Sequence, residues 1–138
     1  MSVVADNYDT GLRYLEYLKT KVNADGFLNH GLGDWGNPEQ ELARENIETA
    51  FLYADAMTLA WFAQLLGREE DQKALTAYAQ KVRENYNAKL LVQDETGAWC
   101  YRSWEKRAQG IVTTKACEAL PLYGCKGSAG DKAVPPEC

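Results

Sequence analysis

The stretch over residues 44–66 constrains the fold more than any other part of the chain. Its apolar residues recur at helical spacing but cover much more than one stripe: Ile47, Ala50, Phe51, Ala54, Met57, Leu59, Ala60, Phe62, Leu65 and Leu66. A helix that is apolar on nearly all sides is buried between other elements. Gly67 follows, where a left-handed glycine commonly ends a helix. We therefore predict a central buried helix over 44–66, with Asn37, followed by Pro38, as an alternative start.

Helical periodicity on both sides of this segment predicts two partner helices. Apolar residues recur at steps of three and four over about 6–22, where Asp6 is the expected N-cap. An ordinary amphipathic pattern covers about 68–87. Because only a short turn at Gly67 separates this pattern from the central helix, the two should form an antiparallel αα-hairpin.

The remainder of the chain has less regular patterns. Two short apolar runs flank an acidic, glycine-containing turn over 89–101, which predicts a small β-hairpin or an extended loop. A last helix is expected over 113–120, and the residues 124–138 have the pattern of an irregular tail. The predicted fold class is therefore all-α, built from antiparallel helical hairpins within one domain over 1–123.

Composition and charge exclude several classes of function. The chain has 138 residues, a net charge of −5 and a pI near 4.9, so it lacks the basic surface that nucleic acids require. It has no apolar run of membrane-spanning length, and residues 1–6 lack the features of a secretion signal. Two disulfides are one possibility, but we expect reduced thiols in a cytoplasmic protein. We also expect no cofactor and no metal, because the cysteines match no metal-binding spacing: Cys100, Cys117, Cys125 and Cys138.

A glycine-rich loop over 27–38 carries the first candidate site residues. Three glycines in six residues disfavour a helix, and large apolar side chains in the same loop predict that it packs against the rest of the chain. Asp34 beside Trp35 suits a carbohydrate, because the carboxylate can accept sugar hydroxyls while the indole covers an apolar sugar face. The alternative is a loop held by a buried Trp35, with Asp34 capping nearby N–H groups. His30 is a candidate for the same substrate site, or else a hydrogen-bonded structural histidine.

Two carboxylates of the central helix are further catalytic candidates besides Asp34. Glu48 and Asp55 lie on the helical face that also carries Leu52 and Leu59. Burial would raise their pKa values and prepare one of them as a proton donor. Glycoside hydrolysis uses such a pair, one acid and one base. The alternative is that both are hydrogen-bonded packing residues.

A second polar and aromatic group lies near the end of the predicted hairpin. Trp99 and Trp104 are its large side chains, and charged residues surround them: Arg102, Glu105 and Arg107. The two tryptophans are candidates to line a sugar cleft. The alternative is a core plug beside a solvated run of charges.

Several segments, in this order, resemble the catalytic domain of bacterial α-L-rhamnosidases. They are Gly-Leu-Gly-Asp-Trp-Gly-Asn-Pro at 31–38, Ile-Glu-Thr-Ala-Phe-Leu-Tyr-Ala-Asp-Ala at 47–56 and Leu-Leu-Gly-Arg-Glu-Glu-Asp at 65–71. Shorter matches at 87–97 and 119–123 continue the order. Other six-hairpin hydrolases use loops related to Gly-Asp-Trp, so the ordered set is more specific than any single piece.

The resemblance implies part of an (α/α)6 toroid of six inner and six outer helices. It implies that Trp35 lines the sugar pocket and that Asp34 helps to shape it. An aromatic wall suits rhamnose, which carries a methyl where most hexoses carry a hydroxymethyl, and Trp99 or Trp104 could supply another wall. The family's acid-bearing segment precedes this loop and its general base lies further on, so the sequence is expected to represent about four helices of the ring.

Two functions follow from these expectations. The first is a glycoside hydrolase of α-L-rhamnosidase type that cleaves terminal rhamnosides or related glycosides by acid/base chemistry. The second is a non-catalytic module that binds sugar or self-associates. A homo-oligomer is expected in either case, because part of a helical ring exposes faces that the whole ring would bury.

Overall fold

The computed structural model describes residues 2–33, 43–114 and 117. Three helices account for most of them: α1 (Val3–Lys19), α2 (Arg44–Leu65) and α3 (Glu69–Leu90). A hairpin of β1 (Leu91–Gln93) and β2 (Trp99–Tyr101) follows, and then a single 3-10 turn, η1 (Arg107–Gln109). The predicted class, helical hairpins with one small β-hairpin, is confirmed. The tail predicted for 124–138 and most of the helix predicted for 113–120 lie outside the described residues.

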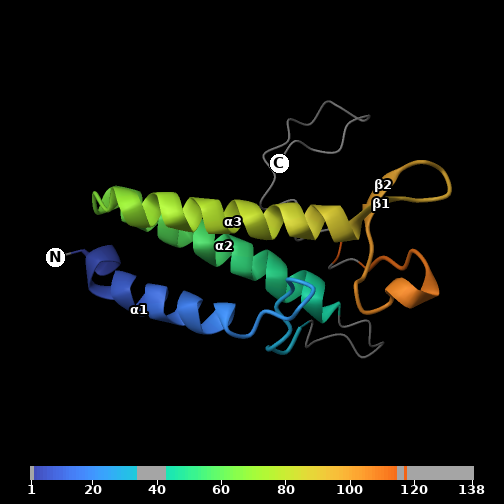
Figure 1. The fold of residues 1–138 in the computed structure, drawn as a ribbon, viewed down its shortest axis with the longest axis horizontal. Coiled ribbons are helices and arrows are strands. Elements are labelled where there is room, and N and C mark those ends of the chain that lie inside the picture. Colours follow the sequence, from blue (N-terminus) through green and yellow to red (C-terminus); the bar gives the residue numbers. More distant parts are fainter. Residues whose placement is uncertain (1, 34–42, 115–116, 118–138) are drawn as a thin grey trace.

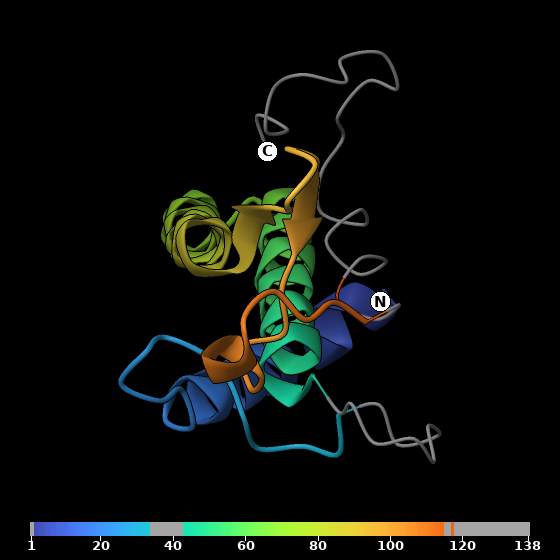
Figure 2. The same ribbon diagram turned by 90° about the vertical axis from the view of Figure 1, so that its right-hand side faces the viewer.

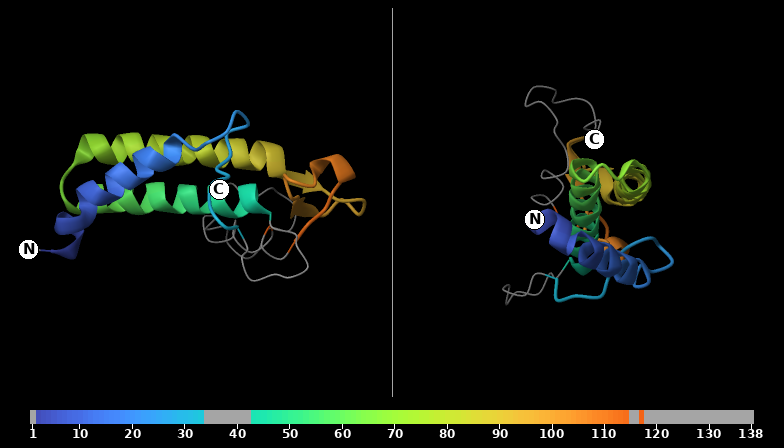
Figure 3. Two further views of the ribbon diagram at one scale, coloured as in Figure 1. Left: turned by 90° about the horizontal axis from the view of Figure 1, so that it is seen from below. Right: turned by 90° about the vertical axis from the view of Figure 1, so that its left-hand side faces the viewer.

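The helices α2 and α3 run antiparallel, and α1 crosses them obliquely (Figures 1 and 3). The core between the three helices contains side chains with no exposed surface, among them Leu15, Leu52, Ala56, Ala63 and Ala79. Small alanine side chains at the contact allow the helix axes to approach closely. None of the helices in the described part of the chain has both the length and the apolar character needed to cross a bilayer.

The start of α1 corrects one prediction. Ser2, and not Asp6, is the N-cap, since the Ser2 hydroxyl accepts a hydrogen bond from the Ala5 N–H at 3.3 Å. Asp6 lies in the first turn instead, where its carboxylate interacts favourably with the positive end of the helix dipole. The helix also ends earlier than predicted, at Lys19, because Val22 forms an isolated antiparallel bridge with Leu28.

The turn between α2 and α3 matches its prediction. Gly67 has a φ of +70° in the left-handed region. The Gly67 N–H donates to the Gln64 carbonyl at 3.1 Å, and the Arg68 N–H donates to the Ala63 carbonyl at 2.9 Å. These two bonds form a Schellman motif and satisfy carbonyls that the helix end would leave free.

One side of α2 contradicts the prediction of burial all round. Four large apolar side chains of this helix are between 38% and 58% exposed: Phe51, Met57, Trp61 and Leu65. These side chains stay exposed because α1 and α3 cover two other sides of α2, and no other described element covers this side. The apolar pattern of α2 thus exceeds what the described residues can bury.

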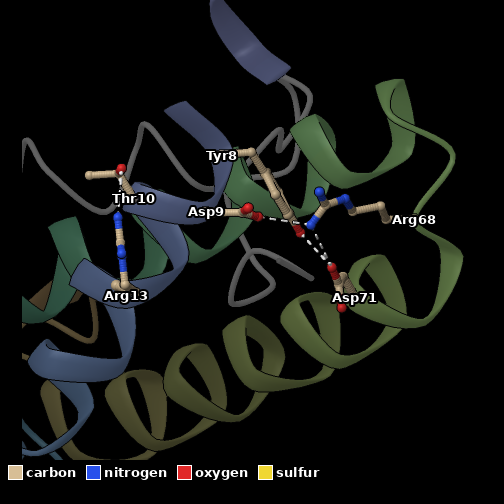
Figure 4. Close-up of polar contacts among 6 residues, drawn as sticks. All are labelled: Tyr8, Asp9, Thr10, Arg13, Arg68 and Asp71. Atoms are coloured by element: carbon tan, nitrogen blue, oxygen red, sulfur yellow. Dashed lines mark hydrogen bonds and ion pairs between the residues drawn. The ribbon is translucent and has the colours of Figure 1, made fainter. Parts of the chain in front are cut away.

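A polar cluster joins the beginning of α1 to the α2–α3 turn (Figure 4). The Tyr8 hydroxyl donates to Asp71 at 3.1 Å, and Arg68 forms an ion pair with Asp9 at 2.9 Å. The Arg68 guanidinium also lies 4.6 Å from the centre of the Tyr8 ring. Burial and the bond to Asp71 raise the pKa of Tyr8 to about 12. The cluster holds the two distant segments together at this end of the helices; a separate bond in Figure 4, from Arg13 to Thr10, lies within α1.

The predicted hairpin is present beyond α3. Leu91 pairs with Tyr101, and Gln93 pairs with Trp99. Asp94 accepts hydrogen bonds from the hydroxyl and N–H of Thr96 and from the N–H of Ala98, and these bonds lower the pKa of Asp94. Figure 2 shows that the segment after the hairpin crosses in front of the first turns of α2, close to the loop that follows α1.

Candidate functional site

The glycine-rich loop packs against α2 and α3 through its first residues. Phe27 is fully buried, and its ring centre lies 4.9 Å from that of Trp104 and 6.5 Å from that of Tyr86. The Leu28 N–H donates to the Thr49 hydroxyl at 3.0 Å. The prediction that the loop packs against the chain is therefore confirmed for this part, whereas Leu32 is 72% exposed.

The carboxylate of Glu48 lies beneath the next part of the loop. Its Oε2 accepts the N–H groups of His30 at 2.5 Å and Gly31 at 2.8 Å, and its Oε1 accepts that of Gly33 at 3.3 Å. Glu48 is only 8% exposed, so these bonds replace the water that the carboxylate gives up on burial. Asp34 and Trp35, which follow directly in the sequence, lie outside the described residues.

A second buried acid, Glu45, lies one turn before Glu48 and was not among the predicted site residues. Its Oε1 accepts the Asn29 amide at 2.9 Å, whereas its Oε2 is buried and receives no bond from a described N–H group. The carboxyl of Glu105 lies within hydrogen-bonding reach and accepts the Arg44 N–H at 2.8 Å. Burial, and then the neighbouring Glu105, raise the pKa of Glu45. Two neighbouring carboxyls can form a hydrogen bond with each other only when one of them keeps its proton.

The one sequence signal for Glu45 is its spacing of three from Glu48, which places both acids on one side of α2. That spacing cannot reveal the partner Glu105, because the two residues are 60 positions apart and meet only through the tertiary fold.

Asp55, the third predicted catalytic residue, lies two helical turns from Glu48, which is about 10 Å along the axis. It is half-buried, and burial raises the pKa of its carboxyl. The direction of this shift is the one that the sequence predicted. Glu48 and Asp55 share no hydrogen-bond partner among the described residues, and both Glu48 oxygens bond to the loop backbone.

The candidate sugar-lining residues have different surroundings. The Tyr17 hydroxyl and the His30 Nε2 are 2.8 Å apart, and both residues are exposed. Trp104 is half-buried, and the Arg107 guanidinium lies 4.1 Å from the centre of its ring. The main-chain N–H of Trp104 donates to the Asn46 Oδ1. Trp99 is 42% exposed on β2.

The candidate site thus combines an anchored loop with two buried acids at the beginning of α2. The described ranges contain no group of three or more histidine, cysteine, aspartate or glutamate residues arranged to hold a metal ion. What the site offers chemically is a set of carboxylates, among which burial raises the pKa of Glu45 and Asp55, beside a glycine-rich loop. Such a set suits a polar ligand with several hydroxyl groups.

Comparison with known proteins shows a matching family and a similar solved structure. Residues 1–123 match the profile of the bacterial alpha-L-rhamnosidase 6 hairpin glycosidase domain. The alpha-L-rhamnosidase from Dictyoglumus thermophilum has a similar solved structure, with a TM-score of 0.68 and 30% sequence identity. The similarity covers 88% of this chain and 13% of that chain. Among curated proteins no significant match is found. The match over 1–123, together with the helical fold, shows that the chain belongs to the bacterial alpha-L-rhamnosidase six-hairpin glycosidase family.

Proposed function

We propose that this chain takes part in the hydrolysis of terminal α-L-rhamnosides or related glycosides, and that the glycine-rich loop contacts the sugar. The observation that carries the proposal is the anchoring of this loop at the beginning of α2, beside the buried acids Glu45 and Glu48. In the proposal, Trp35 lies against the methyl-bearing face of the deoxyhexose and Asp34 accepts hydrogen bonds from its hydroxyl groups.

The chemistry in this proposal is acid/base hydrolysis. Glycosidic bonds are cleaved by a carboxylic acid that protonates the leaving oxygen and a carboxylate that activates water or attacks directly. Asp55 suits the first role, because burial raises its pKa and favours the protonated form. Asp34 is the proposed carboxylate partner. His30, Trp99 and Trp104 are proposed as further sugar contacts.

The experiment uses the full chain, L-rhamnose and a p-nitrophenyl α-L-rhamnoside. We expect saturable binding of L-rhamnose, a binding constant weakened about tenfold or more by Trp35→Leu, and release of nitrophenol that Asp34→Asn and Asp55→Asn each abolish. Trp61→Leu is the matched control, because Trp61 is an exposed tryptophan on α2 outside the loop. Equal binding by the Trp35 and Trp61 variants contradicts the role of the loop. Unchanged hydrolysis in both aspartate variants contradicts their catalytic role.

A second candidate function, self-association as a helical module, is favoured by one observation. The exposed residues of α2 are all uncharged, and they include four large apolar side chains: Phe51, Met57, Trp61 and Leu65. Exposed apolar surfaces of this kind commonly mark contacts with another protein. Sedimentation velocity should show a homo-oligomer that Trp61→Lys converts to monomer. A monomeric wild-type chain at high concentration rejects this candidate.

A further inference from the structure

We propose that Glu48 is a positioning residue whose carboxylate fixes residues 30–33 of the glycine-rich loop, which directly precede Asp34 and Trp35 in the sequence. This inference rests on the proposed function, since the loop matters for activity only if it contacts the sugar. It gives Glu48 a different role from that of a proton donor. Both of its oxygens bond to the protein backbone, at His30, Gly31 and Gly33.

The hydrogen-bonding pattern uses both oxygens of Glu48 as acceptors. Three N–H groups from one short segment converge on Glu48, and an ionised carboxylate can accept all of them because it carries no hydrogen. Bonds to a charged acceptor are stronger than bonds between neutral groups. A glutamine in its place would put an NH2 donor where one of the two acceptor oxygens now lies.

The absence of a side chain at Gly31 is part of the same arrangement. A Cβ added at this position would lie 2.9 Å from the Glu48 Oε1 and 3.2 Å from its Cδ. A methyl group therefore cannot be placed there unless the carboxylate moves. Gly31 and Glu48 act as a pair: the glycine allows the close approach that the carboxylate uses.

The other anchors hold earlier residues of the loop. Thr49 holds the N–H of Leu28, and Glu45 holds the side-chain amide of Asn29. All three anchoring side chains belong to the first two turns of α2, so the loop is fixed to one rigid helix. Among these three anchors, Glu48 is the one that holds residues 30–33. A change at Glu48 should therefore release residues 30–33 while leaving the earlier anchors in place.

The test measures two quantities on the same samples of the full chain. The first is amide hydrogen exchange at His30, Gly31 and Gly33, which reports anchoring without any ligand. The second is the dissociation constant of L-rhamnose. The variants are Glu48→Gln and Gly31→Ala. The matched control is Glu84→Gln, an exposed glutamate of α3.

Glu48→Gln should accelerate exchange at the three amides by about tenfold or more and weaken L-rhamnose binding by a similar factor. Exchange at Leu28, which Thr49 anchors, should change much less. Gly31→Ala should reproduce both effects through a displaced carboxylate, and it provides the answer if Glu48→Gln does not fold. Glu84→Gln should match the wild type in both measurements.

The outcomes separate this inference from the proposed function. Unchanged exchange at the three amides in a folded Glu48→Gln variant overturns the anchoring. Faster exchange at the three amides with unchanged L-rhamnose binding overturns the positioning role. A wild-type chain that binds no L-rhamnose refutes the proposed function and with it the sugar-related role of Glu48, and the exchange data then establish or reject the anchoring alone.

Discussion

Asn46 connects α2 to the segment after the hairpin and provides a sharp test of the packing. Its side chain has no exposed surface. The amide Nδ2 donates to the Arg102 carbonyl at 3.0 Å, and the Oδ1 accepts the Trp104 N–H at 3.0 Å. Asn46→Ala removes both bonds at once and leaves one main-chain donor and one acceptor without their partner.

The expected loss of stability follows from this geometry. A fully buried polar group that loses its partner costs about 1–3 kcal/mol. Because both bonds are only part-buried, the lower end of that range applies to each group, and we expect a loss of about 2–3 kcal/mol in total. The matched control is Asn85→Ala. Asn85 also bonds to main-chain carbonyls, those of Asp25 and Gly26, but is partly exposed, so water can replace its side chain. We expect that control to cost about 0.5–1.5 kcal/mol.

The assay is equilibrium unfolding in urea, followed by the circular dichroism of the helices, for the wild type and both variants. Equal slopes in the three curves ensure that the free energies of unfolding are comparable. Asn46→Ala should lose at least twice as much stability as Asn85→Ala. Both variants lose two hydrogen bonds and differ mainly in burial. Equal losses would therefore refute the argument, because burial would then have no effect on the cost.

Two other perturbations test local features. Burial and Glu105 raise the pKa of Glu45 above its ordinary value of 4.5. Protonated Glu45 therefore stabilises the folded state at low pH, and this stability is lost as the pH rises through the raised pKa. The free energy of unfolding should fall less between pH 4.5 and pH 7 in Glu45→Gln than in the wild type, and parallel pH profiles in urea titrations would contradict this. Gly67→Ala should cost about 1–2 kcal/mol by thermal unfolding, because the φ is +70° although no atom lies within 4 Å of the added Cβ; an unchanged melting temperature would show that the left-handed backbone carries no cost.

The sequence predicts that Glu48 is buried but does not predict which groups it contacts. The spacing of Glu48 on an otherwise apolar helical face indicated a buried carboxylate, and Glu48 is buried. The partners of that carboxylate are backbone groups 15 to 18 residues away, and no side-chain pattern encodes them. Glu45 was missed for the same reason, because its neighbour Glu105 comes from a segment beyond the hairpin.

Features that depend on neighbours along the chain follow from local residue types. The stop at Gly67, the antiparallel hairpin of α2 and α3 and the turn at Asp94 all form through bonds spanning a few residues, so local residue types suffice to predict them. The packing of distant segments sets which side of α2 stays exposed and which groups the buried acids bond. Those outcomes depend on contacts between segments that are distant in sequence. Such contacts matter energetically because a buried polar group without a hydrogen-bond partner is costly.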